Sequence, residues 1–267
     1  MTVSASRRAP HQPRPTPREL ARGLHADFKI EAPSEIEVDL MAWHRGASVH
    51  WRPSGPADAR AVIVGSRATL AIASHMRGTP RSRFSIAHEL AHFLLHRDFD
   101  CLDRLHTPGA ALDPRARAVE FQADDFASEL LLPERFARAR CAAVPSPSLA
   151  HLDALARDFR VSLTVAGFRW PKWTDRPCAF FEAVAKGSSA VLRRVVRSES
   201  FRGTCVQRRP LREGTLALDL LRARRSASSP RERSHTQWWG SSILDGPIVE
   251  ECVPVADGVV VGFLTHE

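Results

Sequence analysis

The chain of 267 residues is 43% hydrophobic and 25% charged, a globular composition that is long enough for one large domain or two smaller ones. Its five scattered cysteines exclude a disulfide framework, and the lack of an apolar run near ~18 residues excludes a membrane-spanning helix. The 38 basic residues outnumber the 30 acidic ones, and nearly all are arginine. The guanidinium group of arginine binds phosphate oxygens well, so an anionic partner such as nucleic acid is one interpretation. The other is a GC-rich genome in which arginine is simply the usual basic residue.

The first 18 residues are rich in proline and arginine and lack the apolar stretch of a signal peptide. They predict a disordered tail, with the ordered part of the chain beginning near Glu19. We therefore expect a cytoplasmic protein without a membrane partner.

Residues 61–74 carry two β-rich runs around Gly65-Ser66, which predicts a hairpin or two adjacent strands. The second run, 68–74, is expected either as an edge strand along which an extended substrate lies, or as an ordinary strand of a sheet.

Two long helices are predicted in the middle of the chain. The first covers about 82–97, with Ser82 as its N-cap, and 98–112 follows as a loop. The second begins at Asp113-Pro114, where an N-cap precedes a proline at the first helical position, and runs to about Leu131.

Breaks at 144–148 and 171–177 divide the rest of the chain, with two short helices between them. The last ninety or so residues contain strand-like runs and one helical patch. The predicted strands are 178–185, 190–198 and 259–267, and the predicted helix is 215–223.

The segment FSIAHELAHFLLH, residues 84–96, contains three histidines spaced four apart. His88 and His92 lie one turn apart on one helix face, which lets two imidazole nitrogens bind one Zn²⁺. Glu89 lies on the adjacent flank, where its carboxylate reaches a metal-bound water without being a ligand, as in H-E-x-x-H. Two unpaired histidines would be costly among these apolar neighbours, so a metal site is favoured over two ordinary helix histidines.

Zinc needs a third protein ligand, and His96 is poorly placed for it. It lies ~6 Å further along the same helix, without a glycine to break that helix, and is interpreted as a helix-end residue favourably placed against the helix dipole. The next helix offers Glu120 and Asp124, one turn apart on an otherwise apolar face. Glu120 is predicted to complete the zinc ligands, and Asp124 to accept the N–H of a ligand histidine. The alternative is a pair of solvated acids.

Two sequence blocks, 84–96 and 120-EFQADDFASELLLP-133, together resemble the ImmA/IrrE family of zinc metallopeptidases. The family pattern is F-(S/T)-(I/L)-A-H-E-x-x-H-x-L-x-H, followed further along by E-x-x-x-(N/D)-x-F-A-x-x-L-(L/M)-(M/L)-P. Asp124 and Leu132 are accepted variants in the second block. The resemblance extends over roughly residues 19–170.

The resemblance implies an α+β, zincin-like fold and an intracellular peptidase that binds one Zn²⁺ per chain and cuts a partner helix-turn-helix repressor. It makes His88, His92 and Glu120 the ligands and Glu89 the catalytic base. Cleavage would derepress genes of stress, mobile elements or defence. The expected division of the chain is a disordered tail (1–18), a zincin-like metallopeptidase core (19–143), a helix-turn-helix-like extension (144–172) and a smaller α+β sensor or interaction domain of a GAF-like kind (173–267).

The chain contains no tyrosine, so a histidine, an arginine or the backbone must stabilise the oxyanion of a peptidase reaction. The histidine candidates are His75, His106 and His151, and the sequence does not rank them.

Cys101 lies nine residues after His92, in the loop that joins the two ligand helices. A thiolate is a strong zinc ligand and would displace the catalytic water. The hypothesis is an inhibitory fourth ligand that is released on activation, and the alternative is an incidental loop thiol.

Residues 151–170, HLDALARDFRVSLTVAGFRW, resemble a helix-turn-helix. The second helix offers only Ser162, Thr164 and Arg169 to base edges, and Arg160 replaces the usual turn glycine. We therefore expect a packing element that completes the peptidase domain, with sequence-specific DNA reading as the alternative.

Residues 186–233 contain 13 Lys/Arg and 4 Asp/Glu, a local excess of nine. Arginines near Phe201 and Trp238-Trp239 are typical of proteins that bind single-stranded nucleic acid, and a solvated basic face is the alternative. Single-stranded DNA, as a DNA-damage signal, is the activator that this pattern suggests. The predicted nucleic-acid contacts are Arg193, Arg194, Arg197, Arg202, Arg208 and Arg209.

Two functions follow from these features. The leading one is a zinc endopeptidase that senses a signal and cleaves a repressor. Its rival is a signal-binding anti-repressor that captures its partner without proteolysis. An intact Glu89 favours the first, because binding alone does not need a general base.

Overall fold

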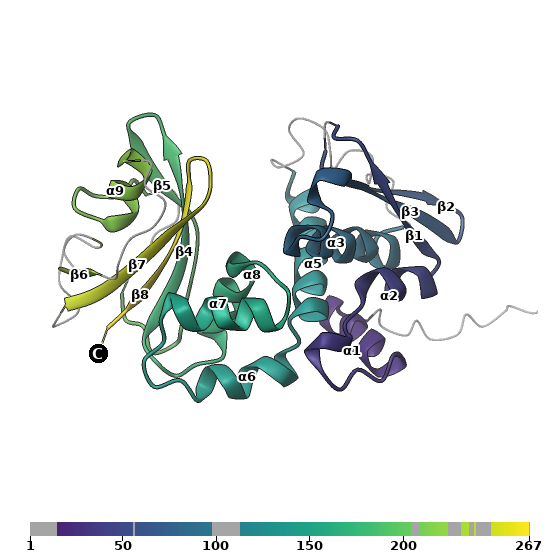
Figure 1. Cartoon of the computed structure of the whole chain (residues 1–267), viewed down its shortest axis with the longest axis horizontal. Coiled ribbons are helices and arrows are strands. Elements are labelled where there is room, and N and C mark those ends of the chain that lie inside the picture. Colours follow the sequence, from purple (N-terminus) through teal and green to yellow (C-terminus); the bar gives the residue numbers. More distant parts are fainter. Residues whose placement is uncertain are drawn as a thin grey trace, which may run out of the picture.

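The computed structural model describes residues 15–55, 57–97, 113–203, 209–223, 231–234, 238 and 247–266. Two lobes are joined by a layer of short helices (Figure 1). The α+β class is confirmed, with helices on a small sheet in the N-terminal lobe and a five-stranded sheet in the C-terminal lobe. Among the residues described, no helix is both long and apolar enough to cross a membrane.

The N-terminal lobe packs helices against a three-stranded sheet. Its elements are α1 (Pro17–Asp27), η1 (Pro33–Glu35), α2 (Val38–His44), β1 (Ala47–Arg52), β2 (Ala59–Val64), β3 (Arg67–Ala73), η2 (Ser74–Met76), α3 (Pro80–Leu95) and α5 (Pro114–Leu131).

The joining layer and the C-terminal lobe follow in the chain. Their elements are α6 (Glu134–Ala142), α7 (Leu149–Asp158), α8 (Leu163–Arg169), η4 (Trp170–Lys172), β4 (Cys178–Lys186), β5 (Ser189–Arg197), α9 (Leu216–Ala223), β6 (Arg231–Ser234), β7 (Pro247–Ala256) and β8 (Val259–Thr265). The five strands form an antiparallel sheet of order β5-β4-β8-β7-β6.

Helix α1 begins slightly before the predicted start of order at Glu19. Thr16 is its N-cap, Pro17 is the first helical residue, and the Thr16 and Glu19 side chains exchange hydrogen bonds with each other's backbone N–H groups. This capping box satisfies two N–H groups that a helix start leaves without partners, so the helix forms at the edge of the proline-rich segment. Residues 1–14 of the predicted tail lie outside the described part.

The predicted hairpin is present, but the predicted edge strand is not at the edge. Strands β2 and β3 are antiparallel around Gly65, whose φ of 59° suits a tight turn. Strand β1 pairs parallel to β3 on its other side, which gives the order β1-β3-β2. Of the two expectations for 68–74, the edge strand was therefore wrong and the ordinary strand of a sheet is confirmed, because both sides of β3 are paired and β2 lies outside it.

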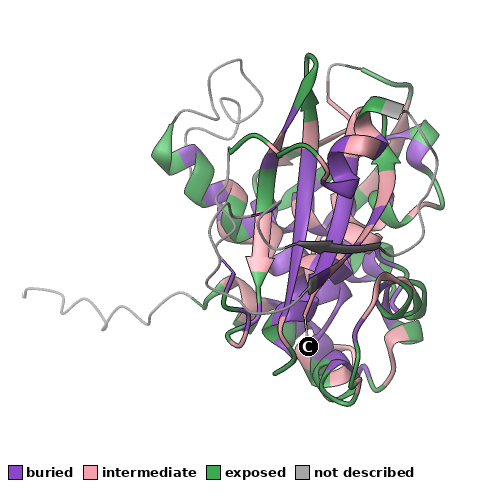
Figure 2. Ribbon diagram, turned by 90° about the vertical axis from the view of Figure 1, so that its left-hand side faces the viewer, coloured by how far each residue is buried: buried purple, intermediate pink, exposed green. Residues whose placement is uncertain are grey.

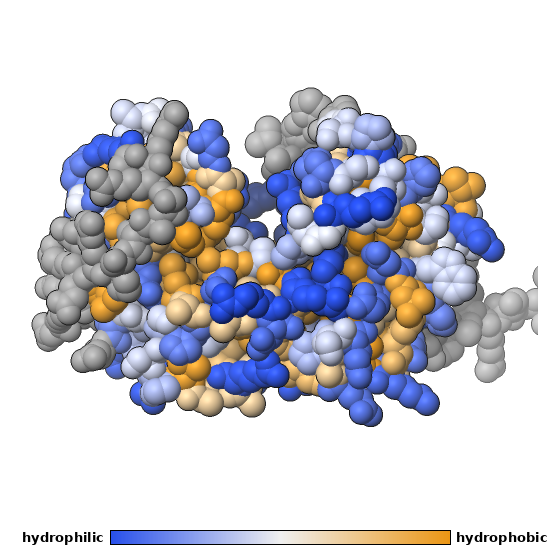
Figure 3. All heavy atoms as spheres, viewed as in Figure 1, coloured by the Kyte–Doolittle hydropathy of each residue, from blue (hydrophilic) through white to orange (hydrophobic). Residues whose placement is uncertain are grey.

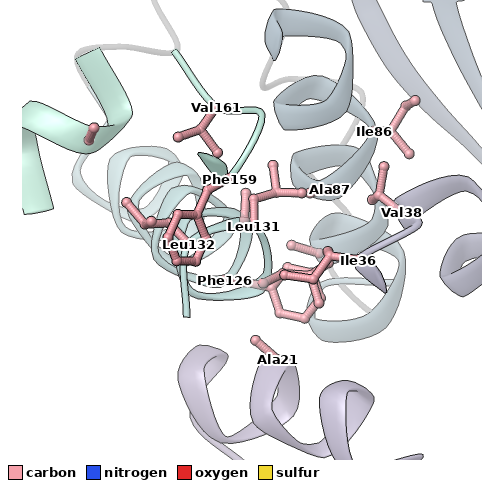
Figure 4. Packing of buried hydrophobic residues seen from close by; sticks show 14 of the residues in the cluster. Ala21, Ile36, Val38, Ile86, Ala87, Phe126, Leu131, Leu132, Phe159 and Val161 are labelled. Atoms are coloured by element: carbon pink, nitrogen blue, oxygen red, sulfur yellow. The ribbon is translucent and has the colours of Figure 1, made fainter. Parts of the chain in front are cut away.

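The two long helices form nearly where they are predicted. Helix α3 begins earlier than expected, since Thr79 rather than Ser82 is its N-cap and accepts a hydrogen bond from the Ser82 N–H. Helix α5 begins after Asp113, whose side chain accepts from Arg115 N–H, as the Asp-Pro pair predicts. The two helices pack together over the apolar core of the lobe, part of which Figure 4 shows.

The C-terminal sheet buries its two central strands, β4 and β8, along most of their length (Figure 2). Strand β7 was not predicted. Two adjacent acidic residues of this strand cap the starts of two helices. Glu250 accepts hydrogen bonds from the Leu216 and Ala217 N–H groups at the start of α9. Glu251 accepts one from the Leu149 N–H at the start of α7. Fully buried Glu250 thus holds α9 on the sheet, and Glu251 ties the lobe to the joining layer.

Helix α8 is packed on both sides. Gly167 lies against the ring of Phe180 on β4, so close that a Cβ would stand 2.2 Å from a ring carbon. On the other side, Arg169 is only 4% exposed and its guanidinium lies 2.5 Å from the carboxylate of Glu129 on α5. These contacts agree with a packing element, because Arg169 is not available to base edges.

The ion pair between Glu129 and Arg169 is buried, and Arg22 of α1 adds a second contact at 3.0 Å from Glu129. Removing the Glu129 carboxylate leaves the buried Arg169 guanidinium without an adequate negative charge beside it. Glu129→Ala is expected to lower the free energy of unfolding by about 3–5 kcal/mol. Chemical denaturation monitored by circular dichroism measures this change.

Glu134→Ala provides the matched control. Glu134 contacts Arg22 at 3.3 Å but keeps a partly exposed side chain, so its loss is expected to cost under about 1 kcal/mol. Equal effects of the two substitutions would contradict a special role for the buried pair.

Candidate metal centre

Three side chains converge between α3 and α5. His88 and His92 face each other one turn apart, with their Nε2 atoms 3.0 Å apart. Glu120 lies opposite them, with carboxylate oxygens 3.2 Å from His88 Nε2 and 3.5 Å from His92 Nε2. One ligand atom from each residue lies within 4.8 Å of the other two. The three predicted ligands are therefore brought together by the fold, and their binding of a metal stays a prediction.

The spacing of these atoms fits zinc. Ligands bound tetrahedrally at 2.0–2.1 Å are separated from one another by about 3.3 Å. The three distances of 3.0, 3.2 and 3.5 Å bracket that value. Two neutral imidazoles and one carboxylate are also the donor set of catalytic zinc sites that keep a fourth position open.

The carboxylates around His88 favour a positive charge there. Burial opposes protonation of His88, but hydrogen bonds with Asp124 and Glu120 outweigh it and raise the pKa of this histidine to about 10. Asp124 Oδ1 lies 3.1 Å from His88 Nδ1, as expected for an acid that accepts the N–H of a ligand histidine. This contact leaves His88 Nε2 directed at the cluster.

Glu89 is buried beside the cluster, with 3% of its surface exposed. Burial raises the pKa of its carboxyl, while the charge of His88 and a hydrogen bond from the backbone N–H of Ala61 act in the opposite direction. The charge of Arg60 also lowers this pKa, so one side chain of β2 adds positive potential near Glu89. Arg60 was not among the residues predicted for the site, although an arginine was one of the donors expected for the oxyanion.

His96 has a role that its helix-end position did not reveal. It is the C-cap residue of α3, and its Nδ1 lies 3.2 Å from Nδ1 of His92. Its Nε2 lies 2.9 Å from Oε1 of Gln122 on α5. The amide oxygen of Gln122 accepts the Nε2–H of His96, so His96 Nδ1 accepts the Nδ1–H of His92. His92 then presents the lone pair of Nε2 to the cluster.

The other predicted contributors to the chemistry lie apart or outside the described residues. His75 hydrogen-bonds to the Ser54 hydroxyl and His151 to the Ser148 hydroxyl, at 3.0 Å and 2.7 Å. Neither partner belongs to the metal cluster. Cys101 and His106 fall within 98–112, so their predicted roles lie outside the described part.

Several of the predicted nucleic-acid contacts are engaged within the C-terminal lobe. Arg193 pairs with the buried Glu182, Arg194 lies over the ring of Phe168 at 4.3 Å, and Arg197 donates to the Gly203 carbonyl. Arg202 and Arg209 are exposed, while Arg208 lies outside the described residues. Trp238 packs on Phe181 and donates to Glu250. A nucleic-acid interface here stays a prediction.

Residues 42–170 match the family model of peptidase M78, described as an IrrE N-terminal-like domain. This segment contains the whole metal cluster, and the match confirms the resemblance to ImmA/IrrE proteins.

Among solved structures, a Mycobacterium tuberculosis transcriptional regulator is similar to this chain, with a TM-score of 0.56 and 18% sequence identity. The similarity covers 93% of this chain and 87% of that one, so both lobes share their fold with it. A search of curated proteins gave no match.

The hydrogen bond between Gln122 and His96 provides a test of the ligand geometry. Gln122→Ala removes the acceptor that fixes the His96 tautomer, so His92 loses its orientation, and zinc affinity is expected to fall by about 10- to 100-fold. Competition with a chromophoric chelator measures this affinity without any need for activity. Unchanged affinity in a folded Gln122→Ala variant would show that the contact does not orient His92.

Proposed function

We propose that this protein is a zinc-dependent endopeptidase that cleaves a partner helix-turn-helix transcriptional repressor and thereby derepresses stress or defence genes. The observation that carries the proposal is the position of Glu89. Its buried carboxylate accepts the Ala61 N–H on one side and neighbours His88 on the other. A general base held beside a zinc-type donor set is a feature of peptidases that a purely binding protein does not require.

His88, His92 and Glu120 would hold the zinc ion. When bound there, zinc supplies Lewis-acid chemistry, which polarises the scissile carbonyl and makes water more acidic. Glu89 accepts the proton of the attacking water and returns it to the leaving amine nitrogen, which lets the tetrahedral intermediate collapse to products. Its raised pKa suits both transfers, since a carboxyl with a pKa closer to neutrality accepts and returns a proton readily.

Strand β2 is the surface on which an extended substrate would lie. Val64 lies opposite Arg67 beside the tight turn, so the hydrogen-bonded positions of β2 alternate from Val64 to Val62 and Arg60. The backbone groups of Ala59, Ala61 and Ile63 therefore point away from β3. Ala61 N–H, the group next to Glu89, lies in this outward row. A peptide that pairs with this row would bring its backbone past Glu89. Arg60 would add positive charge for the oxyanion.

The regulatory part of the proposal rests on charge. Residues 186–233 carry a net excess of nine positive charges, which favours a polyanion such as single-stranded DNA as the activating signal. The alternative function is an anti-repressor that captures its partner without cutting it. Intact Glu89 argues against that alternative, because capture alone gives no use for a buried base.

Glu89→Gln is expected to abolish cleavage of the helix-turn-helix repressor encoded beside this gene, because glutamine cannot accept the proton from water. Zinc binding and repressor binding should persist, since Glu89 is not among the ligands. Intact-mass analysis of the incubated repressor detects a discrete cut, with and without single-stranded DNA. A cut that Glu89→Gln still makes would reject the proposed base. A repressor that the unsubstituted protein binds but does not cut would favour the capture function.

Proline at Ile63 is expected to slow cleavage at least about tenfold, because it removes one outward N–H from the free side of β2 while leaving the pairs with β3 intact. Ile63→Val is the matched control: it also trims the side chain but keeps the N–H. Comparing kcat/KM of the two variants with the repressor as substrate separates the effect of losing the backbone N–H from that of the smaller side chain. Equal rates would exclude substrate pairing along β2.

A further inference from the structure

A cavity of about 820 Å³ lies between the joining helices and the N-terminal lobe, apart from the metal cluster. Its walls come from the start of α2, from β1, from the N-terminal half of α3 and from the segment where α7 ends and α8 begins. This volume is typical of sites for small organic ligands. None of the three metal-cluster residues lines it.

Two arginines converge in this cavity on one acceptor. Arg83 of α3 and Arg160, which follows α7, both donate to the carbonyl of Ile36, at 2.8 Å and 3.2 Å. Within the part of the chain that is described, Arg83 Nε is buried and has no hydrogen-bond partner. Burial lowers the pKa of Arg83, and the charge of Arg160 lowers it further. Two like charges therefore meet beside the cavity, and one of the two guanidinium groups keeps a buried, unsatisfied N–H.

The other charges around the cavity do not cancel this excess. Arg160 also contacts Glu37 at 2.9 Å, and Arg157 pairs with Asp153. Arg77 lies over the ring of Trp51 at 4.7 Å and has no ion pair among the described residues. Arg77 and Arg83 thus face the cavity with Asp39 as the remaining carboxylate, and the N-terminus of α3 adds its partial positive charge.

The backbone at Arg160 is strained in a way that depends on its side chain. Its φ of 53° lies in the left-handed region that glycine occupies at little cost. Glycine would relieve the strain but would remove the guanidinium that reaches Ser34, Ile36 and Glu37. Backbone strain at Arg160, beside a cavity, suggests that its guanidinium has a functional role.

The rest of the wall is mainly apolar. Val38, Ile86 and Val161 form its buried base, with at most 4% of their surface exposed, and Figure 4 shows them on different elements. The half-buried Trp51 and Leu163 provide apolar surface that a ligand can reach. The cavity therefore has arginine guanidinium groups on one side and apolar side chains on another. A few polar groups within an apolar lining are typical of small-molecule sites.

We propose that this cavity binds a phosphorylated small molecule with a flat ring, of the size of a nucleoside monophosphate. The phosphate contacts Arg83 and Arg77, with Arg160 behind them, and the ring lies on the apolar surface of Leu163 and Trp51. Several guanidinium groups match a phosphate better than a carboxylate, because a phosphate offers more oxygens to accept their hydrogen bonds. The ligand joins α3 of the N-terminal lobe to the end of α7, so its binding stabilises the packing between them.

The test uses the full chain and needs neither zinc nor cleavage, so it is independent of the proposed peptidase function. Isothermal titration calorimetry and thermal unfolding are measured with AMP, GMP, CMP and UMP, and with inorganic phosphate alone. At least one nucleotide is expected to bind saturably, to raise Tm and to bind more tightly than phosphate. Arg83→Gln and Arg77→Gln are each expected to weaken this binding about tenfold or more, as the loss of a charge-assisted hydrogen bond would.

Arg138→Gln is the control, because Arg138 is an exposed arginine of α6 that pairs with Glu134 and does not line this cavity. It should bind as the unsubstituted chain does. If Arg83→Gln does not fold, Arg77→Gln decides, since Arg77 makes no ion pair with another described residue whose loss would unfold the lobe. No binding up to about 10 mM nucleotide, equal weakening in all variants, or equal affinity for phosphate and nucleotides would each overturn the proposal.

Discussion

The packing of α5 against α3 is the constraint on which the metal cluster depends. His88 and His92 lie one turn apart on α3 and supply two ligand nitrogens from one side of the cluster. Glu120 can supply the third ligand atom only if α5 has one particular rotation about its axis and one particular position along it. The buried pair of Glu129 and Arg169 restricts that face, because Glu129 lies nine residues after Glu120 on the same helix. A rotation of α5 large enough to withdraw Glu120 would also separate this pair.

Most of the cluster was predictable because its geometry is local. The spacing of His88 and His92, and that of Glu120 and Asp124, follows from the helical repeat, and only the meeting of the two helices had to come from the family resemblance. The contact between His96 and Gln122 was not predictable in this way, because it joins the end of one helix to the flank of another. A third histidine at the same spacing was its only trace in the sequence.

The errors in the fold have physical reasons of the same kind. Nothing in the pattern of 68–74 says which side of β3 receives β1, so the edge strand could not be identified from one strand alone. Strand β7 escaped because its inward face includes Glu250 and its length includes Pro247 and Pro254, which are unfavourable signals for a central strand. The acid is tolerated there because two helix N–H groups, Trp238 and Cys252 satisfy it.

The joining layer determines how the C-terminal lobe can influence the cluster. Contacts run without interruption from Phe180 of the C-terminal sheet to Gly167 and, through Arg169 on the same short helix, to Glu129 of α5. Gly167 leaves no room for sliding against Phe180, and Glu251 adds a second attachment at the start of α7. A small shift of the lobe would therefore be transmitted to α8 rather than absorbed at the joint. Since α8 reaches α5 through a buried ion pair, a displacement of α8 would act on the helix that carries Glu120 through that pair.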